Sequence, residues 1–182
     1  IVVCESTYGD RVHEPIEERE TKLRAALETT VHQKGVLLIP AFSLERTQEL
    51  LFAMNEIFAS WQVRVPIFLD SPMAIRATQV YRENQAFLSF DRSGSGMMTG
   101  GRILHHLKAY LPLSTTTLLV IGYQADGTIG RQILEGASSV RIHGEEVPVK
   151  AQLKKIGAFS AHADQRTLLE WLKTEQTQRA PQ

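Results

Sequence analysis

The stretch TTTLLVIGYQADGTIGRQILEG, residues 115–136, decides the fold class of this 182-residue chain. Its first part is a short apolar run that predicts a buried strand, QADG predicts a turn, and TIGRQILEG predicts a helix. Other apolar runs along the chain are also followed by a turn and an amphipathic segment. This order is typical of an α/β fold with a mostly parallel sheet and helices on both faces, a Rossmann-like arrangement.

The rest of the chain extends this pattern. Strands are predicted at residues 1–5, 36–42 and 65–70, and a hairpin with the turn HGEE at 138–159. Helices are predicted at residues 15–33, 44–61, 72–84, 102–111 and 166–174. The expected boundary residues are a C′ glycine at Gly35, N-caps at Ser43, Ser71 and Asp164, and a first-turn proline at Pro72.

The pattern is interrupted before the helix at 102–111. The segment SFDRSGSGMMTGG, residues 89–101, leads into that helix without a strand before it. A glycine-rich turn at a helix start exposes backbone N–H groups and suits an anion, although this one matches neither GxxxxGK[ST] nor GxGxxG. It is either a phosphate-contacting turn or a tight turn without a ligand, and a dinucleotide site is disfavoured.

Composition excludes several classes of protein. Twenty basic residues balance twenty acidic ones, so no global basic field indicates nucleic-acid binding, although a local positive groove stays open. The single cysteine, Cys4, excludes an internal disulfide framework and is expected to be a buried small hydrophobe. No apolar stretch is long enough to span a membrane and no signal peptide is recognised, so a cytoplasmic protein is expected.

Polar residues gather where the predicted strands end. The motifs ESTYG, PAFSLER, DSPMA, GYQADGT and FSAHAD follow apolar runs, and several of them open helices. In open α/β sheets, ligands bind beyond the carboxyl ends of the strands, and helix N-termini there can hold phosphate. The functional site is therefore expected at this edge.

Two residues at this edge are candidates for chemistry. Glu5 is either a solvent-facing carboxylate or a carboxylate that orients a histidine and raises its pKa. His162 is either a structural histidine or a functional one with room around it. The adjacent pair His105 and His106 does not share a helix face and makes a poor metal clamp. The remaining histidines are expected to be solvated: His13, His32 and His143.

The ordered motifs ESTYGD, LLIPAFSLERTQELL, DSPMA, SGMMTGGR, GYQADGTIGR and FSAHAD resemble those of β-CASP proteins. These proteins are the RNA- and DNA-processing branch of the metallo-β-lactamase superfamily. The branch includes the endonuclease subunit of the eukaryotic pre-mRNA 3′-end cleavage machinery and its bacterial and archaeal relatives. The resemblance extends over essentially the whole chain, and it is closer to the RNA-processing members.

The resemblance implies roles for individual residues. Glu5 matches the acidic residue of the first β-CASP motif, and His162 matches the histidine of the second motif, which contacts the scissile phosphate. Glu5 would hold His162 as the proton donor to the leaving oxygen. The residues implied along the phosphate path are Ser160, Thr99, Gly96, Gly100, Arg102 and Arg131.

Catalysis in the family needs two zinc ions, and their ligands lie upstream of ESTYG and downstream of the SAH motif. The HxHxDH motif and the other ligands are absent from this sequence, so no metal ligand is expected in this chain. The expected organisation is a β-CASP domain at 15–135, flanked by pieces of the metallo-β-lactamase part at 1–14 and 136–182. The third β-CASP motif is also missing. Relatives carry a longer segment before SGSGMMTGG, so either this protein has a shortened loop there or residues are absent from this sequence.

The leading hypothesis is a fragment of a zinc-dependent RNA-processing nuclease that hydrolyses phosphodiesters by metal-activated water. The chain would supply the substrate cleft and the general acid, bind single-stranded RNA, and be inactive without the rest of the metallo-β-lactamase domain. The cleft needs a local cationic strip, and its candidates are Arg46, Arg76, Arg102 and Arg131. The alternative is a non-catalytic RNA-binding or scaffold member of the family, and a nucleotide-binding domain ranks last. The oligomeric state, including a homodimer, stays open.

Overall fold

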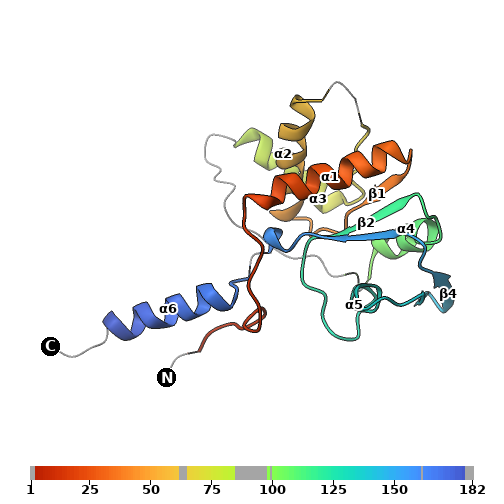
Figure 1. The fold of residues 1–182 in the computed structure, drawn as a ribbon. Helices are drawn as coiled ribbons and strands as arrows, with labels where there is room; N and C mark the ends of the chain where they lie inside the picture. Colours follow the sequence, from red (N-terminus) through yellow and green to blue (C-terminus); the bar gives the residue numbers. More distant parts are fainter. Residues whose placement is uncertain (1–2, 62–64, 85–97, 99, 161, 179–182) are drawn as a thin grey trace.

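A parallel three-stranded sheet forms the centre of the molecule. A computed structural model describes residues 3–61, 65–84, 98, 100–160 and 162–178. The strands are β1 (Val36–Leu38), β2 (Thr116–Val120) and β5 (Gln152–Lys155), in the order β1–β2–β5 (Figure 1). The strands of both neighbouring pairs run parallel. The predicted α/β class with a mostly parallel sheet is therefore confirmed.

The central strand β2 sends alternate side chains into two separate cores. Leu119, and Ile121 directly after the strand, join a core with the helices α1 (Glu18–His32) and α2 (Arg46–Ala59). Leu118 and Val120 join a second core on the other face of the sheet. That core also receives side chains from the elements α4 (Arg102–Tyr110), α5 (Ile129–Leu134), β3 (Ser139–Ile142) and β4 (Glu145–Pro148). Helices thus cover both faces, as predicted.

Several local predictions are confirmed by hydrogen bonds. Ser71 caps α3 (Pro72–Glu83), because its Oγ accepts a hydrogen bond from the Ala74 N–H at 3.2 Å and Pro72 opens the helix. Asp164 caps the last helix, α6 (Gln165–Gln178), by accepting from the Thr167 N–H at 2.9 Å. The antiparallel pair β3–β4 is the predicted hairpin. Its continuation β5, however, leaves the hairpin and joins the main sheet beside β2.

Two predicted strands are wrong in the described residues. Residues 3–5 and 65–70 form no strand, and Cys4 is exposed rather than buried. The side chains of Val3 and Phe68 are 88% and 89% exposed. An apolar run becomes a strand only where a neighbouring strand offers free N–H and C=O groups, and neither segment pairs with β1 or β5.

Two predicted caps are also wrong. After α1, Lys34 takes the left-handed conformation (φ 50°), and Gly35 instead allows close approach to Thr115, whose carbonyl oxygen would lie 1.7 Å from an added Cβ. Ser43 does not cap α2, which starts after Glu45. The Ser43 hydroxyl instead lies 2.9 Å from the Ser71 hydroxyl and joins the starts of α2 and α3.

The two ends of the described chain lie together. The last helix α6 extends away from the body beside the N-terminal segment (Figure 1). A short 3₁₀ turn (Gly157–Phe159) leads toward α6, and an isolated parallel bridge pairs Tyr8 with Asp164. None of the helices in the described part of the chain is both long and apolar enough to cross a membrane.

Leu119→Ala tests the central position of β2. The side chain is fully buried between α1 and α2, so its truncation is expected to lower the free energy of unfolding by about 2–5 kcal/mol. Leu113→Ala is the matched control, because Leu113 is 46% exposed and should change it by less than about 0.5 kcal/mol. Equal effects of the two substitutions in urea unfolding would contradict this packing.

Candidate active site

The structure brings Glu5 and His162 together across most of the chain. The Nδ1 atom of His162 lies 3.4 Å from the Oε2 atom of Glu5, and both side chains are partly exposed. The glutamate comes from the N-terminal segment and the histidine from the turn after β5. Because Nδ1 faces Glu5, the Nε2 atom is the ring atom left to meet a substrate. An acid–base histidine oriented by a carboxylate has this arrangement.

Two backbone N–H groups hold the Glu5 carboxylate. Oε2 accepts a hydrogen bond from Thr7 at 2.9 Å, and Oε1 accepts one from Ala163 at 3.0 Å. The Thr7 hydrogen bond is the main cause that lowers the pKa of Glu5, and the Ala163 hydrogen bond and the His162 charge act in the same direction. The side chain is thus kept ionised, as a partner for an imidazolium must be.

Asp164 joins the two segments that carry this pair. Its carboxylate accepts hydrogen bonds from the backbone N–H groups of His13 and Thr167, both at 2.9 Å. Although burial alone raises the pKa of Asp164, hydrogen bonds from Thr167 and His13 lower it to about 2. Gln165 adds further contacts, since its backbone N–H donates to Arg11 O at 2.9 Å and its side chain donates to Gly9 O at 3.1 Å.

Tyr8 and His13 belong to the site, and the sequence prediction missed both. His13 was expected to be solvated, but it is half-buried and its Nε2 atom lies 3.0 Å from the backbone oxygen of His162. The buried Tyr8 ring contacts the His13 ring edge-on at 4.5 Å and lies 6.2 Å from the His162 ring. The one hint in the sequence is that both residues follow Glu5 within the same short segment.

Ser160 is the implied phosphate contact that lies beside the pair. Its Oγ accepts a hydrogen bond from the His162 N–H at 3.3 Å. Gly100 is exposed ahead of α4, and Arg102 forms an ion pair with Asp70. Among the described residues, no hydrogen bond or ion pair joins Arg102 to Glu5 or His162. Two other predicted residues, Gly96 and Thr99, lie outside the described residues.

Arg131 lies on α5 and forms ion pairs with two carboxylates. Its Nε atom is 2.6 Å from Glu135 and 3.6 Å from Asp126. The Glu135 hydrogen bond raises the pKa of Arg131. The charge of Arg131 also helps to lower the pKa of Asp10, after the larger effect of Arg11.

Arg46 does not line the surface, which corrects its predicted place in a cationic strip. Its side chain is fully buried and pairs with Glu49, which also pairs with Arg19. The two guanidinium carbons lie 5.7 Å (Arg46) and 5.0 Å (Arg19) from the centre of the buried Phe159 ring. An arginine buried with a carboxylate and an aromatic ring is a packing element. Since Phe159 directly precedes Ser160, this cluster anchors the turn that carries His162.

The remaining histidines lie elsewhere. His106 is 2.8 Å from Asp70 and stacks on Tyr110 with ring centres 6.3 Å apart. The ring of His105 lies 4.9 Å from that of His143, in the hairpin turn, and His32 is exposed at the end of α1. His105 and His106 thus contact different neighbours, and the predicted solvent exposure of His32 and His143 is confirmed.

No group of three or more His, Cys, Asp or Glu side chains gathers within the described ranges in a way that could hold a metal ion. The residues present therefore do not by themselves fit the zinc ions that the resemblance implies.

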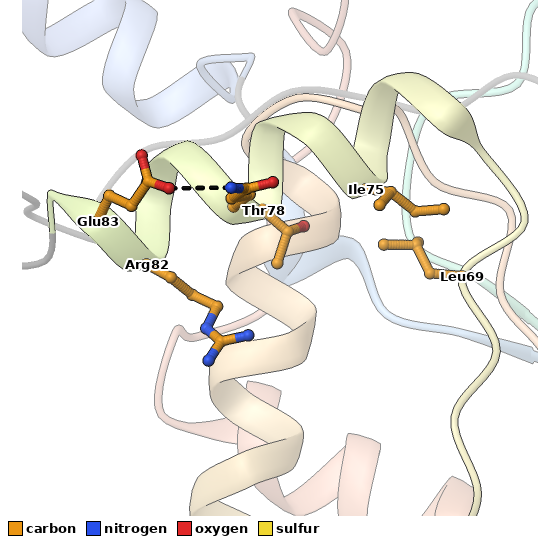
Figure 2. A pocket seen from close by; sticks show the side chains of 6 residues that line it. Leu69, Ile75, Thr78, Arg82 and Glu83 are labelled. Carbon is orange, nitrogen blue, oxygen red and sulfur yellow. Dashed lines mark hydrogen bonds between the residues drawn. The ribbon is translucent and has the colours of Figure 1, made fainter.

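Two hollows differ in what surrounds them. A small one, about 110 Å³, lies beside the candidate pair, and its lining includes Tyr8, Arg11, His13, Glu14, Lys155 and Gly157. A larger open one, about 640 Å³, lies along α3 (Figure 2), where Gln79 donates to Glu83 at 3.0 Å. The larger one is lined by Leu69, Ile75, Thr78, Gln79, Arg82 and Glu83, none of which contacts the pair. The chemistry therefore favours the smaller hollow.

The parallel α/β topology, with a histidine beside a carboxylate beyond a strand end, defines an α/β protein with a candidate acid–base site. Comparison with protein families identifies it further. The Beta-Casp domain matches residues 47–92 and 93–133, and the Zn-dependent metallo-hydrolase RNA specificity domain matches residues 146–178. The chain belongs to the β-CASP family of metallo-β-lactamase-fold proteins. The Beta-Casp match is split between residues 92 and 93, directly ahead of SGSGMMTGG, where relatives are expected to carry a longer segment.

Curated relatives agree with this membership. The chain is 37% identical to Ribonuclease TTHA0252 of Thermus thermophilus, over 96% of this chain and 49% of the relative. It is 30% identical to an RNase J-like protein of Methanocaldococcus jannaschii, over 95% of this chain and 48% of that protein. It is 27% identical to Transcription termination factor FttA of Methanosarcina mazei, over 96% and 35%. The chain thus spans about a third to a half of the relatives it matches.

Asp164→Asn tests the connection between the two segments. A pKa held at about 2 rather than 3.8 stabilises the fold above about pH 4, and this stabilisation is lost as the pH falls from 4 to 2. The substitution is expected to lower the free energy of unfolding at pH 7 by about 1–2 kcal/mol. It should also reduce the acid dependence of stability over pH 2–4.

Glu28→Gln is the matched control, because Glu28 is exposed on α1. Its unfolding curves at pH 7 and pH 3 should follow those of the wild type. If Asp164→Asn and Glu28→Gln gave the same acid profile, the assigned role of the Asp164 carboxylate would be wrong.

Proposed function

We propose that this chain is the substrate cleft and proton-donating part of a zinc-dependent RNA-processing nuclease. The observation that carries the proposal is the 3.4 Å approach of Glu5 to His162, residues that a β-CASP nuclease would use together. Family membership and the ribonuclease names of two relatives support a hydrolytic role on RNA. The general acid, the zinc dependence and the RNA specificity are parts of this proposal.

In the proposed mechanism, His162 donates a proton to the leaving oxygen of the scissile phosphodiester. Glu5 lies next to Nδ1, so Nε2 is the ring nitrogen that would carry the donated proton toward the substrate. Proton donation at this step removes the need to expel an unprotonated alkoxide, and a positioned general acid contributes about 10²- to 10⁴-fold to rate. Ser160, which holds the His162 N–H, would also contact a phosphate oxygen.

Zinc, when bound, would supply the hydroxide nucleophile and polarise the phosphate. The described residues do not gather a ligand set, so we place the zinc ligands in other parts of a longer protein. Relatives that extend to about twice the length of this chain support that placement. The isolated chain would then bind substrate without cutting it.

The rest of the metallo-β-lactamase domain is the proposed intramolecular partner. Large apolar side chains are exposed on both end segments, including Val12 and Ile16 near the start and Leu169 and Trp171 on α6. Apolar surface of this kind is usually covered by another domain or chain. The boundaries after residues 14 and 135 stay a prediction.

Single-stranded RNA would run along the edge of the sheet where the strands end. Arg11 and Lys155 line the hollow beside the candidate pair and offer positive charge for the backbone phosphates. Arg102 and Arg131 extend the positive charge, although each is held in an ion pair that a phosphate would have to replace. Arg76 on α3 is exposed and stays a candidate.

His162→Ala tests the function directly. With zinc present, the longer protein is expected to cut RNA, and His162→Ala is expected to lower kcat by about 10²- to 10⁴-fold without changing bound zinc. The isolated chain is expected to be inert in the same assay. His32→Ala is the matched control, because His32 is exposed at the end of α1.

Three outcomes would contradict the proposal. Normal cutting by His162→Ala would show that His162 is not the proton donor. Cutting by the isolated chain would show that no second domain is needed. If the longer wild-type protein bound RNA but never cut it, the chain would instead belong to a non-catalytic RNA-binding member of the family.

A further inference from the structure

We propose that His13 is a positioning residue that fixes the backbone of His162 and so aims its ring at the substrate. The inference rests on the proposed function, because it assigns a role toward the proposed proton donor. Its basis is the 3.0 Å approach of the His13 Nε2 atom to the backbone oxygen of His162.

The backbone around His162 is held by three different side chains. The His162 N–H donates to Ser160 Oγ at 3.3 Å, and the next N–H, of Ala163, donates to Glu5 Oε1 at 3.0 Å. His13 takes the carbonyl oxygen between these two N–H groups. Together they fix the peptide groups on both sides of the His162 Cα, and this determines where its imidazole can point.

The chemistry of the contact fixes the protonation of one ring nitrogen. A carbonyl oxygen only accepts hydrogen bonds, so the Nε2 atom of His13 must carry a proton. Both the neutral Nε2–H tautomer and the imidazolium satisfy this requirement. The contact therefore persists whichever charge His13 carries, and positioning does not require His13 to titrate.

The His13 ring is itself fixed from two sides. Its backbone N–H donates to Asp164 at 2.9 Å, and the neighbouring Glu14 carboxylate accepts a hydrogen bond from the Gly157 N–H at 3.1 Å. Tyr8 packs edge-on against the ring at 4.5 Å and is in turn packed edge-on against Tyr123 at 5.6 Å. Because these contacts fix the His13 ring relative to the N-terminal segment, its hydrogen bond fixes the His162 backbone relative to the same segment.

A pair of substitutions separates the hydrogen bond from the packing. His13→Gln keeps an N–H donor at a similar reach, whereas His13→Met keeps a similar length without a donor. Both are made in the longer protein and assayed on RNA with zinc. His13→Met is expected to lower kcat about 10- to 100-fold with KM within about twofold, because a shift of about 1 Å in a catalytic group costs that much. His13→Gln is expected to restore kcat to within about threefold of the wild type.

Histidine-selective ¹⁵N NMR of the longer protein gives a readout that does not depend on turnover. At neutral pH, His13 is expected to carry its proton on Nε2, and the His162 resonances are expected to shift in His13→Met but not in His13→Gln. An unprotonated Nε2 on His13 would overturn the inference.

The RNA-cutting assay, run on His162→Ala and both His13 variants, distinguishes the failure of the proposed function from the failure of the positioning role. If His162→Ala cut normally, the proposed function would fail. If His162→Ala were inactive while both His13 variants cut at the wild-type rate, the positioning role alone would fail. Equal losses in His13→Gln and His13→Met would also overturn it, because the donor would then not be the cause.

Discussion

The carboxylate of Asp164 is the connection on which the site depends. It accepts hydrogen bonds from its own helix and from the backbone of His13, which lies 151 residues earlier in the chain. It acts together with the Ala163–Glu5, His13–His162 and Gln165–Arg11 contacts, which join the same two segments. A buried carboxylate with several N–H donors is kept ionised, so the connection is strong wherever the pH exceeds its low pKa.

The sheet and its two cores explain why this connection forms where it does. β5 runs parallel to β2 and delivers the turn after it to the same edge as Tyr123, which follows β2 and packs against Tyr8. On one side of the turn, the buried cluster of Arg19, Glu49 and Arg46 encloses Phe159. Burial raises the pKa of Glu49, and the two neighbouring guanidinium charges oppose that effect. The turn that carries His162 thus follows the packed cluster around Phe159 and precedes the Asp164 hydrogen bonds.

Sequence patterns predicted the parts of the fold that depend on local chemistry. The Ser71–Pro72 cap, the helix at 102–111 and the buried strand at 115–123 follow from side-chain periodicity and capping. The predictions of strands at 1–5 and 65–70 are wrong in the described residues, because an apolar run does not specify its pairing partner. The predictions that His13 is solvated and that Arg46 lines the surface are also wrong. Polar residues are expected at the surface, and only tertiary contacts, which the sequence does not specify, bury these two. The pairing of Glu5 with His162 was predicted only from the resemblance to β-CASP proteins, since no periodicity relates residues so far apart in the sequence.

The most direct test of a proton-donating His162 changes the leaving group rather than the protein alone. An RNA substrate in which sulfur replaces the leaving oxygen at the scissile bond needs no general acid, because a thiolate leaves unprotonated. The account predicts that His162→Ala in the longer protein cuts ordinary RNA about 10²- to 10⁴-fold more slowly than the wild type, yet cuts the sulfur-substituted RNA at nearly the wild-type rate. An equal loss on both substrates would contradict proton donation by His162.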